Sequence, residues 1–166
     1  MSRVIGANNI TAAFASLEAR AVKEVKEIIE LNIGDMAEEA RRNAPGSGDM
    51  IATQGGSIKF DDIKSNRGFT PISQAITYKI ENGGLKGSVT VEISAGEVAA
   101  YVEFGTGQSA ASYLLTVPTE WREIARKYYV NGKGTIIAAP FLYPAFMKYS
   151  VKAVKELKEF LATLRL

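Results

Sequence analysis

Residues that could perform chemistry are scarce in this sequence. It contains no histidine and no cysteine, which excludes Ser-His-Asp and Cys-His catalysis, disulfide bonds and the usual zinc sites. No GxxxxGK[ST] phosphate-binding loop occurs, and Gly105-Thr106-Gly107 lacks the spacing of a dinucleotide-binding turn. We therefore expect a protein that is not an enzyme and that uses no cofactor and no metal.

Asp61 and Asp62 are adjacent carboxylates, a pair that can bind a hard cation or act in acid–base catalysis. Together with Glu92 or Glu97 they would suit a metal-dependent hydrolase. Few other carboxylates lie near them in the sequence, so a solvated loop is the simpler interpretation.

Basic residues are concentrated in the last part of the chain, although the whole protein has a formal net charge of only +2. Between residues 121 and 166, Lys and Arg clearly outnumber Asp and Glu. Such a region can bind a phosphate backbone, so a nucleic-acid-binding module is the alternative hypothesis. A solvated helix face explains the same charges more simply. The aromatic and basic residues that alternate here, as in stacking platforms, are Trp121, Arg122, Arg126, Lys127, Tyr128 and Tyr129.

The elements that must position these residues follow from the apolar periodicity. Spacings of three and four predict helices, and alternating β-branched residues predict strands. Gly34-Asp35 interrupts the first helical pattern, so either one helix bends there or two helices abut. The last helix should carry an apolar stripe with Phe146, Tyr149 and Leu157 beside a basic face. The predicted helices cover residues 8–43, 118–129 and 144–164, and the predicted strands cover 57–60, 75–80 and 88–93.

The remaining segments define the fold class. Residues 46–56 are mostly glycine and polar residues, so we predict a flexible loop there. Two long helices with one apolar stripe each can pack on one face of a small antiparallel sheet. The sequence thus predicts a single α+β domain over residues 1–166, with long N- and C-terminal helices and a short helix near 118–129.

The block from Ala99 to Gly107 has a composition that generic folding does not explain. Glu103 lies among bulky apolar residues and is costly to bury unpaired. It should therefore meet a cation, backbone N–H groups or a neighbouring subunit. Gly105 and Gly107 permit backbone conformations that other residues rarely adopt, so we predict a compact bend. The residues expected to shape this bend are Tyr101, Glu103, Phe104, Gly105 and Thr106.

A second block lies just before the last helix. Pro140 and Pro144 bracket three large residues, and Pro144 suits the first turn of a helix. Phe141 and Leu142 are expected to pack near the bend. Their apolar character favours the core, and a subunit interface is the alternative.

Four segments together resemble the neck, or tail-completion, proteins of long-tailed bacteriophages, the lambdoid type of head–tail joining protein. In order, the four are 40–45 (ARRNAP), 56–58 (GSI), 101–106 (YVEFGT) and 140–145 (PFLYPA). The resemblance extends from about residue 31 to the end. Two regions depart from it. Residues 46–50 lack the Thr-Gly-hydrophobic-basic run usual in the family, and 109–133 is an enlargement between the last two segments.

The resemblance implies a structural virion protein. Such proteins are ring-forming adaptors, so the resemblance implies a homo-oligomeric ring, a hexamer, between the head connector and the tail tube or tail terminator protein. Genomic DNA would pass through the lumen without sequence-specific binding. The resemblance places the protein in the virion neck after assembly in the host cytoplasm. No segment reaches the about 20 apolar residues of a membrane-spanning helix, so no membrane contact is expected.

Overall fold

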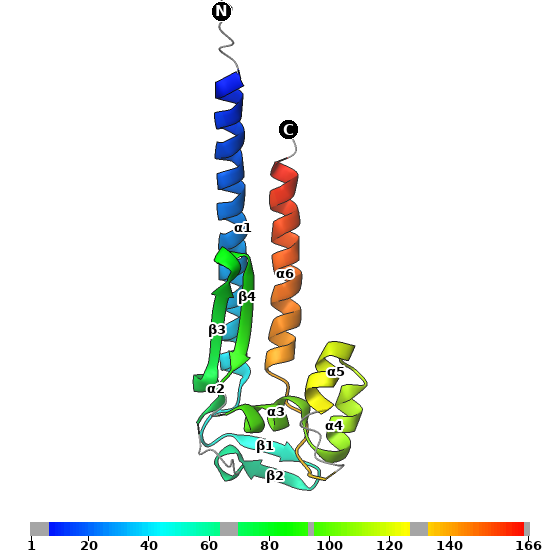
Figure 1. Cartoon of the computed structure of the whole chain (residues 1–166). Coiled ribbons are helices and arrows are strands. Elements are labelled where there is room, and N and C mark those ends of the chain that lie inside the picture. Colours follow the sequence, from blue (N-terminus) through cyan, green and yellow to red (C-terminus); the bar gives the residue numbers. More distant parts are fainter. Residues whose placement is uncertain (1–6, 64–69, 93–94, 127–132, 165–166) are drawn as a thin grey trace, which may run out of the picture.

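The computed structural model describes residues 7–63, 70–92, 95–126 and 133–164, with side chains from residue 15 onward. Two long helices stand side by side on a smaller head built from short helices and strands (Figure 1). This arrangement confirms the predicted α+β class. The elements are α1 (Ala7–Asn43), β1 (Met50–Thr53), β2 (Gly56–Lys59), the 3-10 helix η1 (Phe60–Asp62), α2 (Ile72–Ala75), β3 (Ile76–Glu81), the 3-10 helix η2 (Asn82–Gly84), β4 (Lys86–Val91), α3 (Gly96–Phe104), α4 (Gly107–Leu114), α5 (Thr119–Arg126) and α6 (Leu142–Thr163).

The first helix is continuous, so the alternative of two abutting helices at Gly34-Asp35 is wrong. A glycine inside a helix costs only about 1 kcal/mol relative to alanine. Contacts with α6 offset that cost, among them a 3.0 Å ion pair between Asp35 and Lys152. As predicted, the helix ends just before Ala44-Pro45.

The predicted antiparallel pair is confirmed as β3–β4, with a register from Ile76↔Val91 to Glu81↔Lys86. The strand begins at Ile76 because Ala75 completes the short helix α2. The connecting turn uses Gly83 at φ 62°, in the left-handed region that glycine adopts readily.

A second hairpin corrects the prediction of a flexible loop over residues 46–56. Residues 50–53 form β1, which pairs with β2 in a separate two-stranded sheet. The strand forms because Ile51 is buried in the core. Its neighbours Met50 and Ala52 are exposed, an alternation that the glycine-rich composition conceals.

The β3–β4 hairpin lies along α1 and depends on a close approach. A Cβ atom at Gly87 would clash with the side chain of Ile33 on α1. At the other end of the hairpin, the Arg41 guanidinium donates two hydrogen bonds to the carbonyl oxygen of Ile76, at 2.8 and 3.1 Å. Packing at one end and hydrogen bonding at the other set the position of the hairpin on α1.

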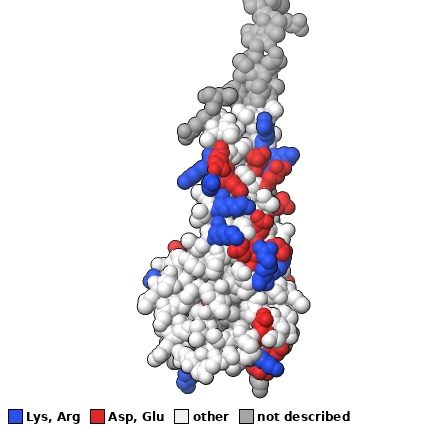
Figure 2. All heavy atoms as spheres, turned by 180° about the vertical axis from the view of Figure 1, so that it is seen from behind, with Lys and Arg blue, Asp and Glu red and all other residues white. Residues whose placement is uncertain are grey.

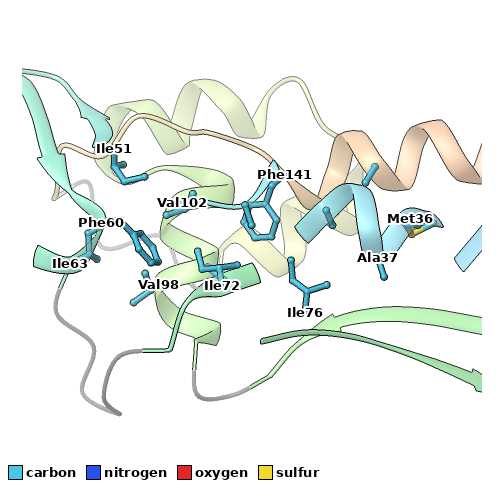
Figure 3. Packing of buried hydrophobic residues seen from close by; sticks show 14 of the residues in the cluster. Met36, Ala37, Ile51, Phe60, Ile63, Ile72, Ile76, Val98, Val102 and Phe141 are labelled. Atoms are coloured by element: carbon cyan, nitrogen blue, oxygen red, sulfur yellow. The ribbon is translucent and has the colours of Figure 1, made fainter. Parts of the chain in front are cut away.

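The core lies in the head, where the last turns of α1 meet α3 and the start of α6 (Figure 3). Phe60 and Phe141 are among its largest fully buried side chains. The cluster is completed by Met36, Ala37, Ala40, Ala44, Ile51, Ile63, Ile72, Ile76, Val98, Ala99, Val102, Ala145 and Tyr149. None of the described residues before Asn32 belongs to it, so α1 extends well beyond the core.

Other boundaries differ from the predictions. The segment predicted as a bend is mostly the helix α3, and the chain turns only at its end, at Gly105. The helix α4 was not predicted, and α6 begins two residues earlier than expected. The expected short helix is confirmed as α5, while residues 127–129 and Ile93 lie outside the described part of the chain. Within the described ranges no helix is long and apolar enough to cross a membrane.

Candidate assembly surface

The Glu103 side chain joins the two blocks that the sequence singles out. It is 3% exposed, and its carboxylate accepts three backbone N–H groups at the start of α6. Oε2 accepts from Phe141 at 2.8 Å and Leu142 at 2.9 Å, and Oε1 accepts from Tyr143 at 2.9 Å. These N–H groups lack partners within the helix, so the carboxylate satisfies them from a distant segment. Of the three partners that the sequence left open for Glu103, the structure shows backbone N–H groups.

Burial dominates the titration of this carboxyl group. It raises the pKa of Glu103 above its ordinary value, and the three N–H donors partly oppose that rise. Burial, with a smaller effect of the Glu103 charge, also raises the pKa of Tyr113 far above its usual range. The Tyr113 hydroxyl is buried and has no hydrogen-bond partner within the described structure.

Gly105 and Thr106 attach the end of α3 to the strand-like segment before α6. The Thr106 N–H donates to the carbonyl oxygen of Ile136, and the Ile136 N–H donates to Thr106 Oγ1, both at 2.9 Å. Gly105 has φ 72° and ψ −173°, a conformation essentially limited to glycine. A Cβ atom there would lie 2.8 Å from the backbone nitrogen of Ala138. The predicted turn is therefore present, one residue after the helix.

The structure places most of the predicted motif residues inside the head. Phe141 is fully buried in the main core. Phe104 belongs to a second cluster, where its ring centroid lies 6.2 Å from that of Trp121 and 6.3 Å from that of Tyr113. Of the remaining motif residues, Glu103 and Thr106 are buried, Tyr101, Pro140 and Leu142 are half-buried, and Pro144 is exposed in the first turn of α6.

The contact between α1 and α6 is mainly polar above the head. Asn32 is buried, and its Nδ2 donates to Glu156 at 2.6 Å, while its Oδ1 has no described partner. Nearer the head, Glu39 accepts a hydrogen bond from the Tyr149 hydroxyl at 3.1 Å and forms an ion pair with Lys148. Figure 2 shows basic and acidic side chains gathered along the helices, whereas the head carries few charges on the same face.

The opposite side of α6 carries a row of apolar side chains that no other described residue covers, with the exposed Lys158 between two of them. Met147, Val151, Val154 and Leu161 are separated by three, four or seven residues, so they lie on one face of the helix. Their exposed fractions run from 42% for Met147 to 63% for Val151. We call these four residues the outer stripe. The outer stripe differs from the predicted apolar stripe of α6, which includes Tyr149, a residue that faces α1.

Asp61, one of the two adjacent carboxylates, has a local structural role. Asp61 Oδ2 accepts from the Gly48 N–H at 3.1 Å and from the Ser47 hydroxyl at 3.2 Å, which holds the loop before β1. Within the described residues no three His, Cys, Asp or Glu side chains are close enough to hold a metal ion. The hydrolase hypothesis therefore gains no support from Glu92 or Glu97.

Part of the basic region is occupied by contacts within the chain. Lys148 pairs with Glu39, and Lys152 pairs with Asp35. The Arg122 Nε donates to the carbonyl oxygen of Val117 at 2.8 Å, and Trp121 packs against the second cluster. Of the six residues in the aromatic and basic pattern, Lys127, Tyr128 and Tyr129 lie outside the described residues.

Comparison with protein-family models, with curated proteins and with solved structures returned no match. The resemblance to phage neck proteins therefore rests on the four segments of the sequence. Each of them contributes at least one residue to the main core or to its edge. Ala44, Val102 and Phe141 are buried in it, and Ile58 packs against it.

Proposed function

We propose that this chain is a structural virion protein of a tailed phage, a ring-forming adaptor that joins the head connector to the tail. Its work is binding, with no bond made or broken. Its partners are further copies of itself, the head connector or adaptor protein, and the tail tube or tail terminator protein. Genomic DNA passes through the lumen of the ring.

The observation that carries this proposal is the outer stripe of α6. Burying an apolar side chain of this size stabilises a protein by about 1.5–3 kcal/mol. Four such side chains in one row on a regular helix are unusual for a surface that stays in water, and they mark a protein interaction site. The stripe lies on a helix whose start is anchored to the head by Glu103, so it is presented on a rigid support.

The head supports the proposal in a second way. The segments that resemble neck proteins meet around one core, and the junction between α3 and α6 uses residues from two of them. An adaptor needs helices held in fixed directions, and this junction provides that. The alternative of a nucleic-acid-binding module is weakened by the ion pairs of Lys148 and Lys152 with α1.

Direct binding to virion proteins tests the proposal. The purified full chain would be mixed separately with head connector rings and with tail tube or tail terminator protein from the virion, and complexes would be detected by native mass spectrometry. The proposal predicts a complex with at least one component on each side of the junction. Failure to bind any capsid or tail protein would refute it.

A further inference from the structure

We infer that the outer stripe of one copy docks in a groove between α1 and α6 of the next copy. The inference rests on the proposed ring and names the surfaces that form it. Both surfaces belong to the described part of the chain. The outer stripe and the groove lie on different sides of α6, and the ion pair between Lys155 and Glu159 lies between them. The contact is therefore head-to-tail, the type that closes into a ring when the rotation between subunits permits.

The donor surface combines apolar and basic side chains. Lys158 follows Val154 by four residues and precedes Leu161 by three, so it lies within the outer stripe. Lys155 flanks the stripe, and its side chain is 75% exposed. Its only described ion pair is a 3.8 Å contact with Glu159 of the same helix, which is weak in water. Both ammonium groups are available to an acidic partner.

The acceptor groove is lined mostly by apolar and acidic side chains. It is open to solvent and lies between the upper parts of α1 and α6. Ile28, Leu31 and Phe160 supply apolar surface, and Leu31 is among the most exposed large apolar residues of the described chain. Glu24 and Glu27 line the α1 side, while Glu156 and Glu159 line the α6 side. Arg20 is the one basic residue in the lining.

The donor surface and the acceptor groove are complementary in apolar character and in charge. The outer stripe would cover Leu31 and Phe160, whereas Lys155 and Lys158 would face the carboxylates of the groove. A twofold contact between two outer stripes is less favourable than docking in the groove, because it brings the lysines of both copies together. A DNA backbone would match the lysines, but it would leave the apolar stripe uncovered.

Charge reversal on each surface tests the inference in the full chain. The donor variant carries Lys155→Glu and Lys158→Glu, and the acceptor variant carries Glu24→Lys and Glu27→Lys. All four side chains are exposed, so circular dichroism should show an unchanged fold. Native mass spectrometry measures self-association of the wild type, of each variant, of their equimolar mixture and of a chain with all four changes.

The inference predicts that the wild type self-associates and that each variant alone loses at least tenfold in self-association affinity. In the mixture each donor meets a groove of opposite charge, so association returns, with the two variants alternating. The four-change chain also associates again. A wild type that stays monomeric, variants that associate normally, or a mixture that stays dissociated would each overturn the inference. The proposed function is judged separately, by binding of the wild type to connector and tail proteins.

Discussion

Glu103 accepts a hydrogen bond from the backbone N–H of Phe141 at 2.8 Å, although the two residues are 38 positions apart. The bond ties the end of α3 to the start of α6. Two more N–H groups at the same helix end share the carboxylate. This contact sets the direction in which α6 leaves the head, and with it the position of the outer stripe.

Replacing Glu103 should destabilise the fold in proportion to the lost acceptors. Glu103→Ala leaves three N–H groups without their partner and should lower the free energy of unfolding by about 3–5 kcal/mol. Glu103→Gln keeps one acceptor oxygen and should cost about 1–2 kcal/mol. Glu92→Gln, a control on an exposed glutamate, should stay within about 0.5 kcal/mol of the wild type. Urea denaturation measures all three, and equal stabilities of the Ala and Gln variants would contradict the acceptor role.

The pH dependence of the free energy of unfolding, compared between the wild type and Glu103→Gln, tests whether burial raises the pKa of Glu103. The pKa of Glu103 is raised in the folded state, so the folded protein binds this proton more tightly than the unfolded chain does. The stability advantage of the wild type over Glu103→Gln should therefore be largest below about pH 4.3, the ordinary pKa of a glutamate, and should shrink as the pH rises through the folded pKa. An advantage that grows with pH would show that the three N–H donors outweigh burial.

The ion pair between Glu39 and Lys148 should have the opposite pH dependence. The hydrogen bond from Lys148 is the largest cause that lowers the pKa of Glu39. Its contribution to stability is present above about pH 4.3 and is lost as the pH falls through the lowered pKa. Lys148→Met should thus lose less stability on acidification than the wild type, whereas Lys133→Met, a change at an exposed lysine, should follow the wild-type curve. Parallel curves for Lys148→Met and the wild type would argue against the pair.

Replacement by alanine should have opposite effects on stability at two glycines, Gly105 and Gly34. Gly105→Ala forces a side chain into a conformation that disfavours it by about 1–3 kcal/mol and places Cβ 2.8 Å from a backbone nitrogen. It should lower the free energy of unfolding by at least about 2 kcal/mol. Gly34→Ala has open space around the new Cβ within a helix and should raise stability by about 0.5–1 kcal/mol. Thermal or urea unfolding distinguishes the two, and a neutral Gly105→Ala would refute the turn described here.

The features of this protein that depend on local sequence patterns could be predicted from the sequence. The α+β class, the β3–β4 hairpin and the two long helices follow from periodicity. The need of Glu103 for a partner follows from the cost of burying a charge. That this partner is the start of α6 could not be predicted from the sequence, because Glu103 and Phe141 are 38 positions apart and are brought together only by the fold.

The outer stripe escaped prediction for a related reason. Periodicity identifies an apolar face on α6 but does not say which part of it α1 covers. In the structure α1 covers the side that carries Tyr149 and Lys152, through hydrogen bonds and ion pairs. Val151 and Val154 are left facing water. Asp35 and Glu39 on α1 supply the partners of these bonds. The apolar pattern of α6 alone does not include residues of another helix.

Native mass spectrometry of the purified full chain, alone and mixed with head connector and tail proteins, is the most direct test of the adaptor role. The account predicts one closed homo-oligomer whose mass is a whole multiple of 17.9 kDa, and complexes of that oligomer with proteins from the head and from the tail. A chain that stays monomeric at every concentration and binds none of these proteins would contradict it.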